Sequence, residues 1–456
     1  MSSKRIKQPL PLPRPVALAA RPFQRFFRTE SASGILLLLA TVVAIVWANS
    51  RFGDGYRHLF ETPISISGFG LGISWPLHRW INDALMAVFF LLVGMEIKRE
   101  LVLGELSSVR KALLPAVAAL GGMLVPALIF IAFNAGEPTL GGWGVPVATD
   151  IAFALGALAL LRGRVPSALA VFLTALAIFD DLGAILVIAV FYGQGVRAAP
   201  LLVAVAITLF VVLMNLFGVR KIWPYMAMGV LLWLAVLASG IHATIAGVVV
   251  GLCIPSRTRR DPAEVDVLLD RLRTINADTE DERFREETLG AIEGYLADTM
   301  SPLDRLVRSL HPWVAFGIVP LFALANAGVL LGALSARDLV APLTLGITLG
   351  LFVGKQVGVF GATWLAVKLR LSPPPTRASW AQIYGVSLLA GIGFTMSLFI
   401  AALAFPSDTL FNEKAKVGIL LGSGLSVVAG LLFLRFATGP KIARPSRTVE
   451  GPNAGG

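Results

Sequence analysis

Two adjacent aspartates, Asp180 and Asp181, lie inside an apolar run from Val165 to Val190 that is long enough to cross a bilayer. One charged side chain at the centre of a membrane helix costs about 2.5 to 3.5 kcal/mol, so the pair costs on the order of 5 to 7 kcal/mol before the two charges repel each other. Ionisable groups at such positions usually belong to an ion or proton site. The pair therefore predicts carboxylate chemistry with a cation or a proton inside the membrane.

Three further groups of polar residues interrupt apolar runs. Thr149 and Asp150 follow Pro146, which cannot donate a backbone hydrogen bond, so we expect the helix to be interrupted there. Lys355 is the one charge in its run and requires an acidic partner. The segment 390–397, Ala-Gly-Ile-Gly-Phe-Thr-Met-Ser, combines two glycines with two hydroxyls and predicts a second interruption. Backbone groups freed at such breaks must be satisfied by a cavity, an ion or a neighbour, which is how transporters build cation sites.

The composition places the chain in a membrane. Of 456 residues, 56% are hydrophobic and only 15% are charged, whereas about a quarter of a soluble domain is charged. Lys and Arg outnumber Asp and Glu by 39 to 28, but the bases lie in short segments between apolar runs, as the positive-inside rule requires. This distribution indicates the lipid bilayer as the partner and argues against nucleic acid. The single cysteine, Cys253, cannot form an internal disulfide.

The apolar runs predict an all-α integral membrane protein with about twelve transmembrane helices. They lie near residues 34–50, 80–97, 112–134, 142–161, 166–190, 198–218, 222–239, 241–255, 312–333, 341–366, 380–403 and 415–436. An even number of crossings puts both termini on one side of the membrane. The segments on that side hold most of the bases, Lys98, Arg110 and Lys368 among them, so we expect both termini to be cytoplasmic.

The two predicted interruptions occupy equivalent places in the chain. They fall in the fourth and eleventh runs, so each is the middle member of a three-helix unit formed by runs three to five or ten to twelve. Seven crossings, an odd number, separate corresponding helices, so the two units face opposite ways. Inverted-topology repeats whose interrupted helices cross near the midplane are a layout of secondary transporters.

The expected organisation is one transporter domain between two tails. We expect a disordered basic cytoplasmic tail over 1–30, the domain over 31–436 and a disordered cytoplasmic tail over 437–456. Within the domain we expect core helices in 112–190 and 341–436, interface helices in 34–97 and 198–333, an outer loop over 52–78 and a cytoplasmic loop over 256–310. The outer loop alternates apolar with small or polar residues around Gly68-Phe69-Gly70, which predicts a β-hairpin. Because an isolated hairpin is marginal in water, we expect it to pair with a second copy and form a homodimer.

Six strings of this sequence resemble the NhaA family of bacterial sodium/proton antiporters, and together they cover nearly the whole chain between about residue 30 and residue 436. The strings are residues 93–101, 147–156, 175–184, 239–247, 310–314 and 390–397. The resemblance implies an electrogenic antiporter that exports Na⁺ or Li⁺ and imports H⁺ by alternating access. It also implies regulation by pH and a place in the bacterial inner membrane, with neither enzyme activity nor a cofactor.

The resemblance assigns roles to the polar residues of the membrane. Asp181 and Asp180 are similar to the family's cation and proton site. Thr149 and Asp150 match the helix crossing, and Lys355 matches the base that opposes the carboxylates. We expect Asp181, Asp180 and Thr149 to supply oxygen ligands to the transported Na⁺. Because adjacent side chains on a helix point about 100° apart, we expect Asp181 to bind the ion and Asp180 chiefly to pair with Lys355.

Candidate pH-responsive residues lie outside this group. The resemblance implies this role for Glu96, Arg99 and Glu100 at the cytoplasmic end of the second helix, and His242 and His311 are further candidates. Two positions depart from the family pattern, since Val307 and Arg308 precede His311 where an acid and a histidine are expected. This departure leaves the pH of activation open.

Alternatives remain for single residues and for the whole chain. Lys355 either carries a proton or serves only as the ion-pair partner of Asp180, and His242 is either a pH sensor or a hydrogen-bonded structural residue. An intramembrane aspartyl protease and a passive cation channel are the alternative functions. No Gly-x-Gly-Asp string occurs at Asp150 or Asp181, and the helix breaks with a base at the midplane favour a carrier over a channel.

Overall fold

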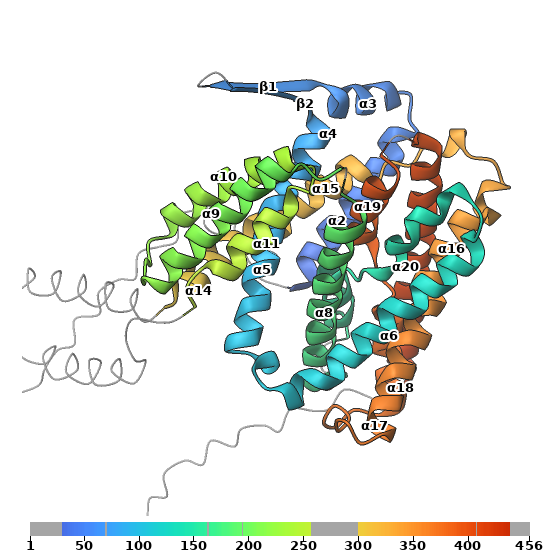
Figure 1. The fold of residues 1–456 in the computed structure, drawn as a ribbon. Coiled ribbons are helices and arrows are strands. Elements are labelled where there is room, and N and C mark those ends of the chain that lie inside the picture. The colour runs from blue at the N-terminus through green and yellow to red at the C-terminus, as the bar shows by residue number, and fades with distance from the viewer. Residues whose placement is uncertain are drawn as a thin grey trace, which may run out of the picture.

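The computed structural model describes residues 30–68, 71–161, 164–193, 195–256, 300–406 and 408–437. In these ranges the chain is helical apart from its connections and one two-stranded sheet (Figure 1). Nearly all of both predicted tails, most of the predicted cytoplasmic loop and the tip of the predicted hairpin lie outside the described residues.

Helices carry α labels, and short 3₁₀ or π segments carry η labels. The N-terminal half contains α2 (Glu30–Ala48), α3 (Gly53–Glu61), α4 (Leu77–Arg79), η1 (Trp80–Leu85), α5 (Met86–Val102), η2 (Glu105–Ser107), α6 (Val109–Asn134), η3 (Pro138–Val147), α7 (Ile151–Ala159), α8 (Ser167–Phe191), α9 (Ala198–Leu216), α10 (Ile222–Ser239) and α11 (Thr244–Cys253). The C-terminal half contains α14 (Pro302–Trp313), η4 (Val314–Ile318), α15 (Val319–Asn326), η5 (Leu331–Ala333), η6 (Asp338–Val340), α16 (Pro342–Leu349), η7 (Gly350–Gly354), η8 (Gln356–Phe360), α17 (Gly361–Lys368), α18 (Trp380–Leu389), α19 (Phe394–Ala404) and α20 (Thr409–Ala437).

Eight helical stretches of the described chain are long and apolar enough to cross a membrane, and the number is eleven if each of three bent pairs is one span. Two bent pairs are the predicted interruptions, η3 with α7 at 43° and α18 with α19 at 44°. The eighth predicted run forms only the ten residues of α11. That is about 15 Å of helix against a hydrocarbon core of about 30 Å. The count of twelve and the inverted repeat therefore stay predictions.

A short helix occupies the start of the predicted outer loop. α3 turns 112° away from α2 and forms the third bent pair. It buries Tyr56 and Phe60, and the Tyr56 ring lies 5.6 Å from that of Trp47 on α2. These two aromatic side chains, one helical turn apart, attach the nine-residue helix to the bundle.

The alternating segment after α3 forms an antiparallel hairpin of β1 (Pro63–Gly68) and β2 (Leu71–Pro76). Ile66 is opposite Ile73 in the register. In Figure 1 the hairpin extends beyond the helices at one end of the molecule. That end is called the hairpin end below.

α14 begins inside the loop predicted over 256–310. Ser301 caps its first turn by accepting a hydrogen bond from the backbone N–H of Asp304 at 3.0 Å. Leu303 and Val307 are buried, and α14 packs against α5. The last residues of the predicted loop therefore form the start of a helix that continues into the span Pro302–Asn326.

α11 lies in backbone contact with α5 because glycines face the seam between them. A Cβ atom on Gly251 would lie 2.5 Å from the carbonyl oxygen of Leu91, and one on Gly247 would overlap the carbonyl oxygen of Ala87. Small residues of this kind let membrane helices approach closely. The seam fixes α5, which carries three of the candidate pH-responsive residues.

Gly247→Ala should destabilise the protein, because the added methyl group must push α11 away from α5. Overpacking of this kind costs about 1–3 kcal/mol. We expect a melting temperature several degrees lower, measured by a thermal-shift assay on purified protein in detergent. Gly361→Ala is the matched control, since nothing lies within 4 Å of its Cβ position. Equal melting temperatures for the two variants would contradict the packing argument.

Candidate functional site

One carboxylate, that of Asp150, joins the two interrupted helices. Its Oδ1 accepts a hydrogen bond from the backbone N–H of Phe153 at 3.0 Å and so caps α7. Its Oδ2 accepts hydrogen bonds from the backbone N–H and the hydroxyl of Thr395, at 3.1 and 2.5 Å, in the first turn of α19. The Asp150 N–H donates to the carbonyl of Ile392 at 2.6 Å. A negative charge therefore faces the positive ends of two half-helices.

Further hydrogen bonds hold this crossing. Oγ1 of Thr149 is 2.9 Å from the carbonyl oxygen of Ala390, and the hydroxyl of Ser397 donates to the carbonyl of Val145 at 2.8 Å. Carbonyl groups freed where one helix breaks thus find donors on the other interrupted helix. Irregular backbone at membrane depth is tolerated only where such partners exist.

A buried ion pair lies beside the crossing. Nζ of Lys355 is 2.6 Å from Oδ2 of Asp180, and both side chains are fully buried. The hydroxyl of Thr149 donates to the same oxygen at 2.6 Å. Removing one partner of a buried pair leaves an uncompensated charge in a low-dielectric interior, so the three groups depend on one another.

Asp181 occupies a different environment from its neighbour. It is 2% exposed, and its Oδ1 is buried without a hydrogen-bond partner among the described residues, as is Oδ1 of Asp180. Such orphaned oxygens are rare in native proteins and call for an explanation. The described chain has no group of three or more His, Cys, Asp or Glu side chains placed to hold a metal ion. A cation at Asp181 therefore needs hydroxyl or carbonyl oxygens among its ligands.

The structure brings together the five residues predicted for the transport site, Thr149, Asp150, Asp180, Asp181 and Lys355, by direct bonds or by adjacency in the chain. The predicted pairing of Asp180 with Lys355 is present, whereas the roles of all five stay predictions.

Sequence analysis missed two features of this site. Thr395 is bonded to Asp150, although only its segment, 390–397, was singled out. Lys355 lies between two π segments, η7 and η8, and π segments are frequent at functional sites. Beside it, Gln356 accepts a hydrogen bond of 2.8 Å from the hydroxyl of Tyr384 on α18. A hydroxyl inside a predicted helix break could have identified Thr395 as a site residue. The apolar pattern around Lys355 does not distinguish a π segment from an α-helix.

The candidate pH-responsive residues do not form one cluster. Glu96, Arg99 and Glu100 share the last turns of α5, and Nε of Arg99 is 3.2 Å from Oδ1 of Asp304 on α14. His311 is exposed near the C-terminal end of α14. These four residues therefore belong to two neighbouring helices.

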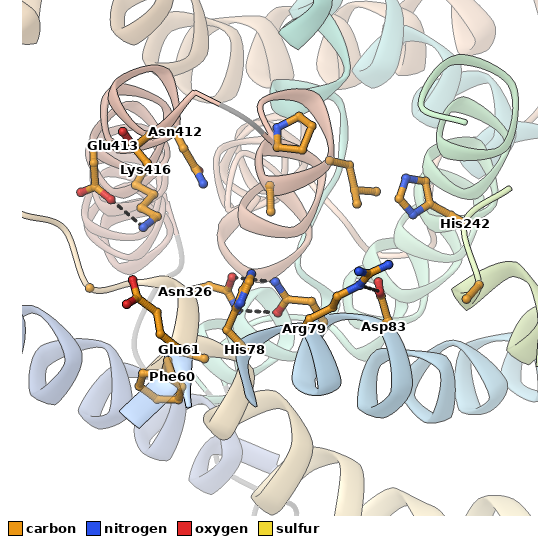
Figure 2. Close-up of a pocket in the computed structure, with 18 of the residues that line it drawn as sticks. Phe60, Glu61, His78, Arg79, Asp83, His242, Asn326, Asn412, Glu413 and Lys416 are labelled. Atoms are coloured by element: carbon orange, nitrogen blue, oxygen red, sulfur yellow. Dashed lines mark hydrogen bonds and ion pairs between the residues drawn. The ribbon is translucent and has the colours of Figure 1, made fainter. Parts of the chain in front are cut away.

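His242 lies elsewhere, in the connection between α10 and α11. It lines a cavity of about 980 Å³ at the hairpin end, together with polar and charged side chains from α3, α4, η1 and α20 (Figure 2). Asp83 is among them and forms an ion pair with Arg79 at 3.2 Å. Asp83 and Arg99 are 16 residues apart on one span, which is about 24 Å of helix. His242 is thus separated from the Arg99 group by most of a membrane thickness.

Comparison with known proteins then assigns the chain to a family. The family model described as Na⁺/H⁺ antiporter 1 matches residues 24–434, which include every residue of the site. The chain belongs to this family. The resemblance seen in the sequence motifs is thereby confirmed.

Known proteins match this chain over most of its length. The Na(+)/H(+) antiporter NhaA of Anaeromyxobacter sp. (strain Fw109-5) is 50% identical over 435 residues, covering 95% of this chain and 95% of that protein. The Na(+)/H(+) antiporter NhaA 1 of Myxococcus xanthus (strain DK1622) is 47% identical over 445 residues, covering 97% and 98%. The solved structure of the sodium proton antiporter MjNhaP1 from Methanocaldococcus jannaschii gives a TM-score of 0.46 at 15% identity, covering 92% of this chain and 94% of that chain.

Lys355→Met should destabilise this member of the Na⁺/H⁺ antiporter 1 family by about 3–5 kcal/mol, because it leaves the Asp180 charge buried and unpaired. Adding Asp180→Asn should restore most of the lost stability. The measurement is the melting temperature of purified single and double variants in detergent at neutral pH.

Lys414→Met is the matched control for this test. Lys414 pairs with Asp338 at 2.8 Å, but the two side chains are 16% and 20% exposed. Partly solvated pairs contribute about 0–1 kcal/mol, so this variant should lose little stability. If the double variant is no more stable than Lys355→Met, the destabilisation does not come from an unpaired Asp180.

Proposed function

We propose that the protein is an electrogenic Na⁺/H⁺ antiporter that exports Na⁺, or Li⁺, in exchange for H⁺ by alternating access. Its location is the bacterial inner membrane, with both termini in the cytoplasm, and its activity responds to pH. The observation that carries the proposal is the pair of buried carboxylate oxygens without partners, on Asp180 and Asp181, beside two crossing interrupted helices. The names of the relatives, Na(+)/H(+) antiporters, support it.

Competition for carboxylate oxygens explains the exchange. Asp150, Asp180 and Asp181 are buried together, and Lys355 is the base bonded to this group. Carboxylates so close in a low dielectric cannot all stay ionised without further positive charge. Either Na⁺ or protons supply that charge. Because both use the oxygens of Asp181, the binding of one displaces the other.

Lys355 offers a second group that can exchange a proton. Its ammonium group is held by Asp180. If Na⁺ engages the Asp180 carboxylate, the ammonium loses its partner and releases a proton more easily. Proton release from both Asp181 and Lys355 against one Na⁺ moves net charge, which makes the exchange electrogenic. If Lys355 is a purely structural partner, its proton stays in place throughout the cycle, and electrogenic exchange then requires the second proton to come from another carboxyl group of the site.

A protease or a channel fits the geometry less well. The Asp150 carboxylate accepts three hydrogen bonds across the helix crossing, so its oxygens are engaged rather than free to activate water. A passive channel requires a continuous water-filled path. Asp180, Asp181 and Lys355 are instead 0%, 2% and 0% exposed.

Asp181→Asn should abolish Na⁺-driven proton movement, because a neutral amide neither exchanges the proton nor balances the charge of Na⁺. The assay uses proteoliposomes with an imposed membrane potential, added Na⁺ and a pH indicator inside. Wild-type protein should give a Na⁺-dependent pH change whose rate follows the potential. Asp54→Asn, at an aspartate side chain that is 91% exposed, should exchange like the wild type. Retained exchange in Asp181→Asn would refute the site, and Na⁺ flux without proton movement would indicate a channel.

We also propose that the hairpin joins two copies of the chain into a homodimer. The sheet has two strands in the described residues, so its outer edges present unpaired backbone groups. Ile64 and Ile66 of β1 are 40% and 58% exposed. A second hairpin can pair with such an edge and cover these side chains.

Deleting residues Ile64–Trp75 should weaken dimerisation in detergent and leave exchange largely intact. Pro63 and Pro76 are opposite each other at the base of the hairpin, so a short Gly-Ser linker can connect them without moving α3 or α4. The measurement is the molar mass from light scattering over a dilution series. Ser65→Ala keeps both strands and should dimerise like the wild type. A stable dimer after the deletion would exclude the hairpin as the interface.

A further inference from the structure

The cavity at the hairpin end stops about two helical turns short of the transport site. On α19, Thr395 is bonded to Asp150, whereas Ala402 and Leu403 line the cavity. Phe399 lies between them, one turn beyond Thr395 and thus about 6 Å farther along the helix. Its side chain is fully buried, at 0% exposure. Phe399 therefore belongs to the barrier that separates the cavity from the site.

Two other aromatic rings hold Phe399 in place. Its ring centroid is 5.5 Å from that of Phe90 on α5 and 6.2 Å from that of Phe322 on α15. Both of these rings are 1% exposed or less. Tilted and edge-to-face contacts of this kind fill space closely and leave no polar group for an ion. Phe399 comes from an interrupted helix, whereas its two neighbours belong to the unbroken spans Leu77–Val102 and Pro302–Asn326.

An amide pair in the lining of the cavity ties these two unbroken spans together. The side chains of Asn82 and Asn326 donate to each other, at 3.1 and 2.8 Å, and dashed lines mark both bonds at Asn326 in Figure 2. Both residues line the cavity and are only 8% exposed. Asn326 also donates to the carbonyl of Phe322 at 2.9 Å, one turn back. The amide pair thus fixes the relative position of the helices that carry the rings flanking Phe399.

We propose that Phe399 is the gate between the hairpin-end cavity and the carboxylates, and that the pair of Asn82 and Asn326 positions the rings on which it closes. The inference rests on the proposed antiport, since alternating access requires a barrier that opens on one side at a time. Withdrawal of Phe399 with its interrupted helix joins the polar cavity to Thr395. The unbroken spans keep their hydrogen-bonded amide pair while this happens.

The test measures access to the site from the hairpin end and does not depend on transport. Cys253, the single cysteine, is replaced by Ser, and Thr395→Cys places a thiol one turn from Phe399 on the same helix face. A membrane-impermeant maleimide is added to one face of oriented proteoliposomes, and Ser65→Cys on the exposed hairpin identifies that face. Phe399→Ala should speed labelling of the Thr395→Cys thiol from the hairpin end by about tenfold or more, because labelling follows the population with an open barrier.

Graded variants separate gating from a folding defect. Phe399→Leu should give an intermediate rate. Asn326→Leu, which removes the amide pair at similar volume, should speed labelling by less than Phe399→Ala does. Phe130→Ala is the matched control, since Phe130 is also 0% exposed but lies on α6, outside the three-ring cluster.

The outcomes are distinct. An unchanged rate in folded, monodisperse Phe399→Ala and Phe399→Leu would overturn the gate, and so would an equal increase in Phe130→Ala. If the Phe399 variants in the Thr395→Cys background label as expected but wild-type protein shows no Na⁺/H⁺ exchange, the proposed function fails while the barrier at Phe399 stands.

Discussion

The carboxylate of Asp150 is the group on which the proposed transport site depends. Two helices break inside the membrane, and each break leaves backbone groups that lipid cannot satisfy. A single buried charge is equally unfavourable there. The structure resolves both problems together, because the carboxylate caps α7 and binds the first turn of α19. Removing the charge alone would leave the backbone groups at the breaks without partners, and removing the breaks alone would leave the charge without donors. The crossing of the two interrupted helices also places the Thr149 hydroxyl against Asp180.

The adjacent carboxylates of Asp180 and Asp181 have different partners but influence each other. Both lie on the unbroken helix α8, so they cannot move independently. Asp180 is bonded to Lys355 and Thr149, while Asp181 keeps an oxygen without a partner. A positive charge arriving at Asp181 weakens the repulsion on Asp180, and a charge leaving it strengthens that repulsion. In the proposed antiport cycle, the ion pair with Lys355 is therefore coupled electrostatically to the occupancy of Asp181.

Much of the site was predictable because charges inside apolar runs have few explanations. Asp150, Asp180 and Lys355 each stood out because a charged side chain inside an apolar run carries a high free-energy cost in the membrane. Pro146 and the glycines of residues 390–397 indicated the two interruptions. The aromatic barrier was not predictable, since Phe399 is one of many apolar residues in its run and only packing distinguishes it.

The ends of several helices also depend on contacts between distant parts of the chain. α15 ends at Asn326, seven residues before the end of the predicted run at 333. The backbone beyond it is held by hydrogen bonds to Asn49 and Glu413, from opposite ends of the sequence. α11 is only ten residues long and relies on its glycine seam with α5. A local pattern carries no information on such partners, which is why the boundaries were less accurate than the presence of the spans.

The hairpin and the barrier are connected through one unbroken span. The hairpin is fixed at its base, where the indole N–H of Trp80 donates to the carbonyl of Ile64 at 3.0 Å and the ring of Trp75 lies 5.1 Å from that of Trp80. Asn82 and Phe90 follow on the same span. A dimer held by the hairpins would therefore immobilise the helix that carries one side of the barrier. Movement relative to that helix would then fall to other elements, among them the interrupted helices that carry Phe399 and the hydrogen-bond donors to Asp150. Opening the barrier would thus also move part of the site.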